Sequence, residues 1–186
     1  LAGETVPTQV PDFQPAPPTG AWGVGRRHVV FSDPSRARLP AARRDLQAWI
    51  HYPIAPGSTS RSTILPADWQ AAYQPLLAKR VGDAAAIALL QARWPVTDAA
   101  PIAAGDDRFP VIVFAHGYGQ MPSNYQALIS GLVSEGHVVV AIASAGVAHL
   151  VLLPAGRQVL KDDISDALYQ ASADDIVFAA RQTQRL

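Results

Sequence analysis

The sequence predicts an α/β protein whose central sheet starts with an antiparallel hairpin and continues with parallel strands joined by crossover helices. Three observations predict it. Residues 111–115 and 137–143 are short, almost wholly apolar stretches, typical of strands buried on both faces of a parallel sheet. Residues 124–135, between them, space their apolar side chains as a helix does. Two further β-type segments, 28–31 and 46–52, come before this unit.

Composition excludes several classes of protein. The chain has 186 residues, enough for one domain with a buried core. Apolar residues make up 49% and charged residues 16%, which excludes a disordered chain. Fifteen basic and fifteen acidic side chains balance, so no net field attracts nucleic acid or an anionic membrane. Cysteine is absent, which excludes disulfides and thiolate catalysis, and no apolar run is long enough to span a membrane.

The N-terminal end predicts an arm rather than part of the core. Residues 1–20 carry five prolines with little periodicity, which indicates an extended arm on the surface or a disordered tail. Residues 21–186 are expected to form one domain. The chain begins at Leu1 without Met, and a cleaved secretory signal is the explanation that we favour over a trimmed chain. A secreted or periplasmic protein is therefore expected, with a cytoplasmic location as the alternative.

The first β-type segments are expected to form an antiparallel hairpin. The segment 28–31 ends at the turn signal Asp33-Pro-Ser-Arg36, since Asp and Pro favour the opening positions of a type I turn. The segment 46–52 is mostly apolar, and Pro53 is expected to end its ladder of hydrogen bonds.

A helical insertion is expected at about residues 64–105. Residues 67–80 and 83–94 have helical composition, the second segment being rich in Ala and Leu. The first helix is expected to be capped by Asp68 or by the turn at Pro66.

The remaining elements follow the pattern of a βαβ unit and its continuation. Ser123 is expected to cap the helix 124–135, and Gly136 to end it. A right-handed crossover would place 137–143 parallel to 111–115. Farther along, residues 148–153 and 159–160 predict a hairpin, and residues 165–185 predict a long helix with a face of small residues.

The end of the strand 111–115 carries the most informative motif, His116-Gly-Tyr-Gly119. Gly117 and Gly119 allow backbone conformations closed to other residues, so that main-chain N–H groups can turn toward a ligand. An oxyanion hole needs N–H groups held in this way. The alternative is a tight strand-to-helix turn without a catalytic role.

Several segments of the chain resemble a known protein family. The segments 20–25, 51–53 and 109–143 resemble the N-terminal part of α/β-hydrolases of the platelet-activating factor acetylhydrolase and dienelactone hydrolase-like group, which includes many carboxylesterases. The segments 148–160 and 174–178 resemble the hairpin after the fourth strand of this group and the helix that leads to its nucleophile strand. The resemblance therefore spans nearly the whole chain, and 109–143 is its specific part.

The resemblance implies a serine-dependent carboxylic ester hydrolase that needs no cofactor. The main-chain N–H of Tyr118 would be one oxyanion-hole donor, within a loop formed by His116, Gly117 and Gly119. The ring of His116 would brace this loop by hydrogen bonds. No charged residue flanks the motif, so we expect a small-molecule ester with a small or moderately apolar acyl group.

The covalent catalyst is expected to lie outside these residues. An α/β-hydrolase needs a Ser in a Gly-x-Ser-x-Gly elbow, then an acid and then a His, and no such elbow exists here. The nearest imitation contains Ser144, but Ile142 is too bulky for its first position and a hairpin is expected to follow. The other histidines have no metal-ligand spacing, so no metal is predicted.

The expected sheet order makes 111–115 an edge strand, because the nucleophile strand that would lie beside it is absent. An apolar edge is an aggregation template, so we predict a partner segment, either a second chain or a C-terminal region of the same gene product. Two alternatives to an acetylhydrolase-like esterase stay open. These are a cutinase-like polyesterase and a non-catalytic α/β-hydrolase-like binding domain.

Overall fold

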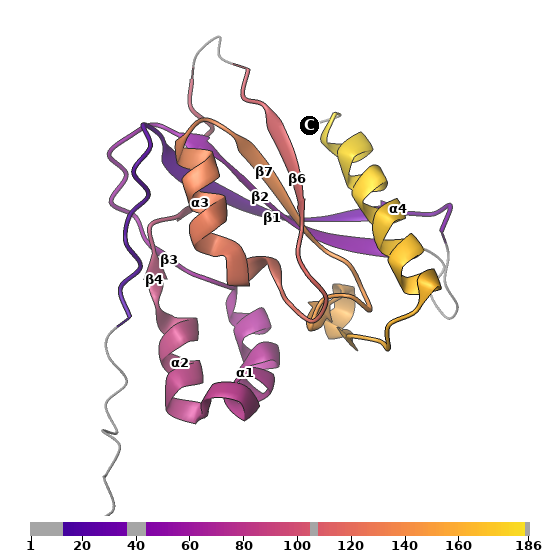
Figure 1. The fold of residues 1–186 in the computed structure, drawn as a ribbon. Coiled ribbons are helices and arrows are strands. Elements are labelled where there is room, and N and C mark those ends of the chain that lie inside the picture. Colours follow the sequence, from indigo (N-terminus) through magenta and orange to yellow (C-terminus); the bar gives the residue numbers. More distant parts are fainter. Residues whose placement is uncertain (1–12, 37–43, 105–107, 185–186) are drawn as a thin grey trace, which may run out of the picture.

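The computed structural model describes residues 13–36, 44–104 and 108–184, and these form three layers (Figure 1). The central layer is a mixed sheet with the strand order β5-β1-β2-β7-β6. Helix α3 (Gln126–Ser134) covers one face and helix α4 (Asp166–Thr183) covers the other. The expected α/β class with a mixed sheet is confirmed. Residues 1–12 of the Pro-rich arm expected at 1–20 lie outside the described residues, as does Arg185.

Strands β1 (Gly23–Asp33) and β2 (Arg44–Ile54) form the antiparallel hairpin that the sequence predicted, and both are longer than predicted. Pro53 does not end the ladder, since it pairs with Val24 inside β2. The carbonyl oxygen of Pro53 accepts from the N–H of Ala103, on the side away from β1. In an antiparallel strand the N–H and C=O of one residue point to the same side. The N–H that Pro53 lacks would therefore point away from β1, and the β1–β2 ladder loses no hydrogen bond.

Strands β6 (Val111–Ala115) and β7 (Val138–Ala143) are parallel, and the predicted crossover between them is confirmed. A 3-10 turn, η1 (Pro122–Tyr125), precedes α3. Ser123 is not the cap, because the Asn124 side chain accepts from the Met121 N–H at 2.7 Å instead. Gly136 has a φ of 89° directly after α3, as a left-handed helix stop requires.

The two parallel strands differ in burial. Five of the six residues of β7 are buried, as predicted. The prediction that β6 is buried on both faces is wrong for the described residues: both its ends are exposed and its centre is half-buried. The physical reason is position, since β6 is the last strand of the sheet order and has a described neighbour on one side only.

The insertion lies at the end of the sheet where β6 and β7 finish (Figure 1). Helices α1 (Ala67–Val81) and α2 (Asp83–Gln91) are confirmed, and Pro66 rather than Asp68 is the N-cap residue of α1. The second helix ends three residues earlier than predicted, because Ala92 has a non-helical ψ of 136° and Arg93 and Trp94 pair with Thr63 and Ser62 instead.

Short strand pairs tie the insertion to the sheet. Strand β4 (Arg93–Trp94) pairs with β3 (Ser62–Thr63), and β5 (Thr97–Asp98) runs parallel to β1. Buried Arg26 pairs with the Asp98 carboxylate at 2.8 Å and also donates to carbonyl oxygens of the β3 region. The sequence patterns did not predict these contacts.

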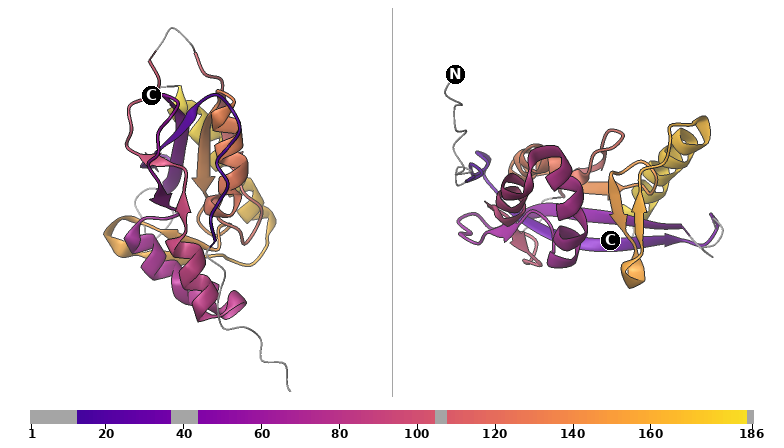
Figure 2. Two further views of the ribbon diagram at one scale, coloured as in Figure 1. Left: turned by 90° about the vertical axis from the view of Figure 1, so that its left-hand side faces the viewer. Right: turned by 90° about the horizontal axis from the view of Figure 1, so that it is seen from below.

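After β7, the predicted hairpin is present as β8 (Leu150–Leu152) and β9 (Gln158–Leu160), joined by the 3-10 turn η2 (Pro154–Gly156). Seen from below, this hairpin lies beside α1 (Figure 2), with which β8 shares a hydrophobic cluster. Ser165 caps α4 by accepting from the Leu168 N–H at 3.2 Å.

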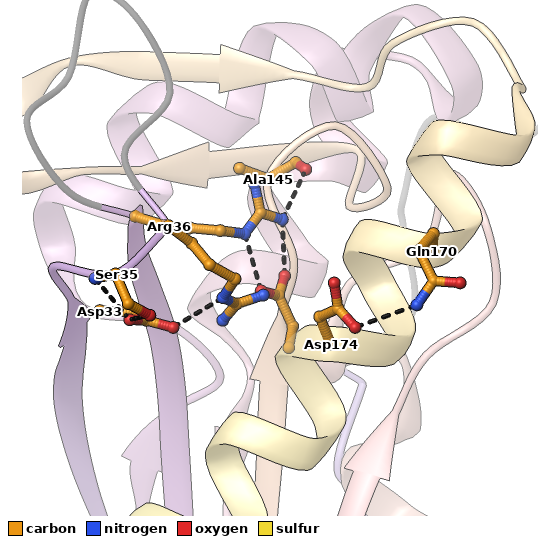
Figure 3. Close-up of polar contacts among 8 residues, drawn as sticks. Asp33, Ser35, Arg36, Ala145, Gln170 and Asp174 are labelled. Atoms are coloured by element: carbon orange, nitrogen blue, oxygen red, sulfur yellow. Dashed lines mark hydrogen bonds and ion pairs between the residues drawn. The ribbon is translucent and has the colours of Figure 1, made fainter.

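Helix α4 is fixed to the sheet by a buried ion cluster (Figure 3). Asp175 is fully buried, and its two carboxylate oxygens accept from the Arg44 guanidinium at 2.7 and 2.6 Å. Arg36 adds a third bond to Asp175 at 2.9 Å and also pairs with Asp33 at 2.6 Å. Bidentate Arg–carboxylate pairs of this kind have strict geometry, so the cluster fixes where α4 sits.

Candidate active site

The loop after β6 is held against the segment that follows β7. The N–H of Gly119 donates to the Val147 carbonyl at 2.9 Å, and the N–H of His149 donates to the Gln120 carbonyl at 3.0 Å. Gly119 has a φ of 69°, which favours glycine over any residue with a side chain. Within the loop, the N–H of Gln120 donates to the Gly117 carbonyl at 3.1 Å. The loop therefore has a fixed shape at the carboxyl ends of the two parallel strands.

These bonds leave some main-chain N–H groups of the loop available. The N–H of Gly119 is used by Val147. Among residues 13–36, 44–104 and 108–184, no acceptor bonds to the N–H of Gly117 or of Tyr118. A group of this kind can bind the oxygen of a ligand at the end of a parallel sheet, which is where ligands of such sheets bind.

His116 lies beneath the loop. It is 8% exposed, and its Nδ1 lies 2.8 Å from the carbonyl oxygen of Gly117, to which it donates. Burial lowers the pKa of His116, so the ring is neutral at neutral pH. Nε2 is buried and has no partner in the described part of the chain. A neutral ring that donates into its own loop fits the bracing role that the sequence suggested.

The Tyr118 side chain contacts the chain just beyond β9. Its hydroxyl donates to the Asp162 carbonyl at 2.5 Å. The Lys161 ammonium donates to the same hydroxyl at 3.3 Å and lies 5.0 Å from the centre of the Tyr118 ring. The expectation that nothing charged flanks the motif is therefore wrong in three dimensions. Only the path of the hairpin brings Lys161 to this loop, and no local pattern could have found it.

Ser144 follows β7 but does not sit on a strand-to-helix elbow. Ser144 is 3% exposed, and its main-chain carbonyl accepts from the N–H groups of Val147 and Ala148 in a tight turn. Gly146 in this turn has a φ of 86°, and the chain continues into β8 rather than into a helix. The predicted hairpin therefore follows Ser144, whereas a helix follows the nucleophile of a strand-to-helix elbow.

The other histidines have structural surroundings. His51 is buried in β2, where desolvation and the nearby Arg26 charge lower its pKa to about 3. His28 stacks on Trp49 with ring centres 4.8 Å apart. His149 contacts the ring of Tyr73 in α1. No group of three His, Asp or Glu side chains that could hold a metal occurs among the residues that the structure describes.

Two known kinds of esterase resemble this chain. The family model described as "Platelet-activating factor acetylhydrolase, isoform II" matches residues 72–147, which run from α1 to the turn after β7 and include the His116–Gly119 loop. The structure of a ferulic acid esterase from Streptomyces cinnamoneus superimposes with a TM-score of 0.64 and 25% sequence identity over 88% of this chain. The chain is similar to platelet-activating factor acetylhydrolase-like esterases of the α/β-hydrolase superfamily.

This finding confirms the resemblance inferred from the sequence. The chain spans 46% of the length of the ferulic acid esterase chain. No curated protein sequence matched it. In the described ranges, no helix is both long enough and apolar enough to cross a membrane.

Proposed function

We propose that this chain is the part of a serine-dependent carboxylic ester hydrolase that supplies one oxyanion-hole donor, the main-chain N–H of Tyr118. His116, Gly117 and Gly119 shape the loop that holds it. The observation that carries the proposal is this N–H, which lacks an acceptor among the described residues and lies at the end of a parallel strand. The similarity of the surrounding residues to two kinds of esterase supports it.

The proposed reaction is acyl transfer. A serine attacks the ester carbonyl, and negative charge develops on the carbonyl oxygen. The Tyr118 N–H donates to this oxygen, and a single donor of this kind is worth about 10²- to 10³-fold in kcat. The serine, its histidine and the acid are proposed to lie outside these residues, and the substrate is a small-molecule ester.

We also propose that a further segment pairs with β6, either from the same gene product or from a second chain. Val111 at the start of β6 is 52% exposed. On α4, beside β6, the apolar side chains of Tyr169, Ile176 and Val177 are exposed as well. An added strand would cover this apolar surface and satisfy the outer N–H and C=O groups of β6. Size-exclusion chromatography with mass spectrometry tests this; a stable soluble monomer of only these residues would contradict it.

The activity is tested with p-nitrophenyl butyrate and a fluorophosphonate on the intact gene product. Turnover that the fluorophosphonate abolishes, with one covalently labelled serine, is the expected result. Neither turnover nor labelling would instead favour a non-catalytic binding domain with the same fold.

The role of the Tyr118 N–H is tested by replacing this residue with its α-hydroxy acid, which exchanges the N–H for an ester oxygen and keeps the side chain. We expect kcat to fall about 10²- to 10³-fold while KM changes little. The melting temperature should fall only slightly: this N–H has no acceptor among the described residues, but the Gly117 carbonyl, which accepts from Gln120 and His116, becomes a weaker ester acceptor. An unchanged kcat would exclude Tyr118 as a donor.

Tyr118→Phe is the matched control. It removes the hydroxyl that contacts Asp162 and Lys161 but keeps the main-chain N–H. Its effect on kcat should therefore be much smaller than that of the α-hydroxy acid.

A further inference from the structure

Tyr118 presents two different groups at its two ends. Its main-chain N–H is the proposed oxyanion donor. Its hydroxyl, at the far end of the side chain, accepts from the Lys161 ammonium at 3.3 Å. A positive charge is therefore held about one tyrosine side chain away from the position proposed for the ester carbonyl.

Several contacts fix Lys161 in this position. Its ammonium lies 5.0 Å from the centre of the Tyr118 ring, within the range of a cation–π contact. Its aliphatic stem passes beside the loop, since a Cβ built on Gly119 would lie 3.6 Å from the Lys161 Cδ. The next residue, Asp162, is bound by its own N–H to the Gly146 carbonyl at 2.8 Å. The charge is thus carried by a segment that is bonded to the turn after β7.

The Lys161 ammonium is not held in an ion pair within the described residues, and the carboxylates of Asp162 and Asp163 follow it in the sequence. The neighbouring Asp162 carboxylate is directed at the Gly146 backbone, where an added Cβ would lie 2.6 Å from its Oδ2. Further positive charge is near. Burial lowers the pKa of His149, whose N–H is bonded to the loop, and the Arg80 and Lys161 charges lower it further.

We infer that Lys161 is a specificity-determining residue that selects esters bearing a carboxylate or similar anionic group on the acyl chain, a few bonds from the ester carbonyl. This inference rests on the proposed esterase function. The carbonyl oxygen binds the Tyr118 N–H while the anionic end meets the ammonium at the Tyr118 hydroxyl. The charge is exposed, so the preference is modest and depends on ionic strength.

The test compares two esters with the same six-carbon acyl chain, mono-p-nitrophenyl adipate and p-nitrophenyl hexanoate. The first ends in a carboxylate and the second in a methyl group. For the intact gene product, the ratio of kcat/KM for adipate to that for hexanoate should fall about two- to fivefold on Lys161→Met, and further on Lys161→Glu. Lys161→Arg should keep most of the ratio, and 0.5 M NaCl should reduce it in the parent protein.

Lys79→Met is the matched control, since Lys79 is an exposed lysine in the last turn of α1. It should leave the ratio unchanged. A structural role of Lys161 alone would slow both esters equally, so an unchanged ratio in Lys161→Met would overturn the inference.

A binding measurement separates this inference from the proposed activity. Monomethyl adipate is titrated into ¹⁵N-labelled protein, and the amide signals of Tyr118 and Gly119 are followed. Saturable shifts that Lys161→Met weakens support the anion preference even if neither p-nitrophenyl ester is hydrolysed. Lack of turnover would then count against the esterase proposal alone, whereas shifts that are absent or insensitive to Lys161 would overturn the specificity proposal.

Discussion

Strands β6 and β7 are parallel neighbours with similar apolar sequences, yet they have different surroundings. β7 lies between β2 and β6 and is covered by α3 and α4, so five of its six residues are buried. β6 has the same helices on its faces but one described strand beside it, and its ends are exposed. Apolar composition thus indicates that a strand is suited to burial, whereas its position in the sheet decides how much of its surface is buried.

The difference coincides with a division of roles. The β2–β7 side carries the buried polar contacts that hold the layers together, including Arg44 with Asp175 and His51 with Gln126. The β6 side ends in the His116–Gly119 loop, whose N–H groups are partly free of protein acceptors in the described residues. An N–H group can bind a ligand only if no protein acceptor already occupies it. A rigid neighbouring region keeps such a group in the orientation that the ligand needs.

The largest expected effect comes from breaking the anchor of α4, which covers both strands. Asp175→Ala leaves the Arg44 guanidinium buried without its carboxylate, and about 3–5 kcal/mol of unfolding free energy should be lost. Urea unfolding measures this. Asp174→Ala, one residue earlier, is the control. Among the described residues Asp174 bonds only the exposed Gln170, so its loss should cost under about 0.5 kcal/mol. Equal losses would show that the cluster does not anchor the helix.

A direct comparison of the strands uses the same substitution in each. Val140→Ala in β7 removes methyl groups from a residue that is 1% exposed and should cost about 2 kcal/mol. Val111→Ala in β6 affects a residue that is 52% exposed and should cost under about 0.5 kcal/mol where these residues stand alone, and more where the proposed further segment covers β6. Chemical denaturation of both variants gives the comparison. A cost at Val111 similar to that at Val140 would mean that β6 is covered in solution, by a further strand or a second copy.

Buried His51, which lies beside β7, should make the stability of the protein depend on pH. His51 pairs with Val139 in register, and its folded pKa of about 3 lies below the unfolded value of 6.5. Between these values the unfolded chain binds a proton that the folded chain does not, so stability falls as the pH falls. The slope from this residue is about 1.4 kcal/mol per pH unit below pH 6.5, and zero above it.

Thermal melts at pH 4.5, 5.5 and 7.5 measure this slope for the parent protein and for His51→Gln. The variant should lose part of the slope, while the parts from His28, His116 and His149 remain, because burial lowers their pKa values too. Identical slopes would mean that His51 is protonated in the folded protein.

The smallest expected effect concerns the loop at the end of β6. Gly119→Ala forces a side chain into a left-handed conformation and should cost about 1 kcal/mol. Gly117→Ala is the matched change, since Gly117 has no positive φ and an added Cβ would lie 3.6 Å from the Tyr125 hydroxyl, an ordinary contact. Differential scanning calorimetry of the two variants would contradict the described loop if Gly117→Ala were the more destabilising.

Local patterns predicted much of the fold because each depends on residues close in sequence. The helical spacing at 124–135, the glycine stop at 136 and the apolar strands predicted the crossover correctly. Errors occurred where another local side chain or a strand pairing replaced the expected contact. Asn124 replaced Ser123 as the side chain that bonds the start of the turn, and the pairing of β4 with β3 accompanies the early end of α2.

The sequence by itself determined the α/β class, the parallel β6–α3–β7 unit and the left-handed Gly119 of the loop, because period, apolar runs and glycine freedom are local properties. The freedom also predicted for Gly117 is not used, since its φ is not positive. Tertiary structure alone decided the Arg44–Asp175 pair across 131 positions and the Lys161–Tyr118 contact across 43 positions. Charge and burial act through space, so they are settled only when the folded chain brings distant segments together.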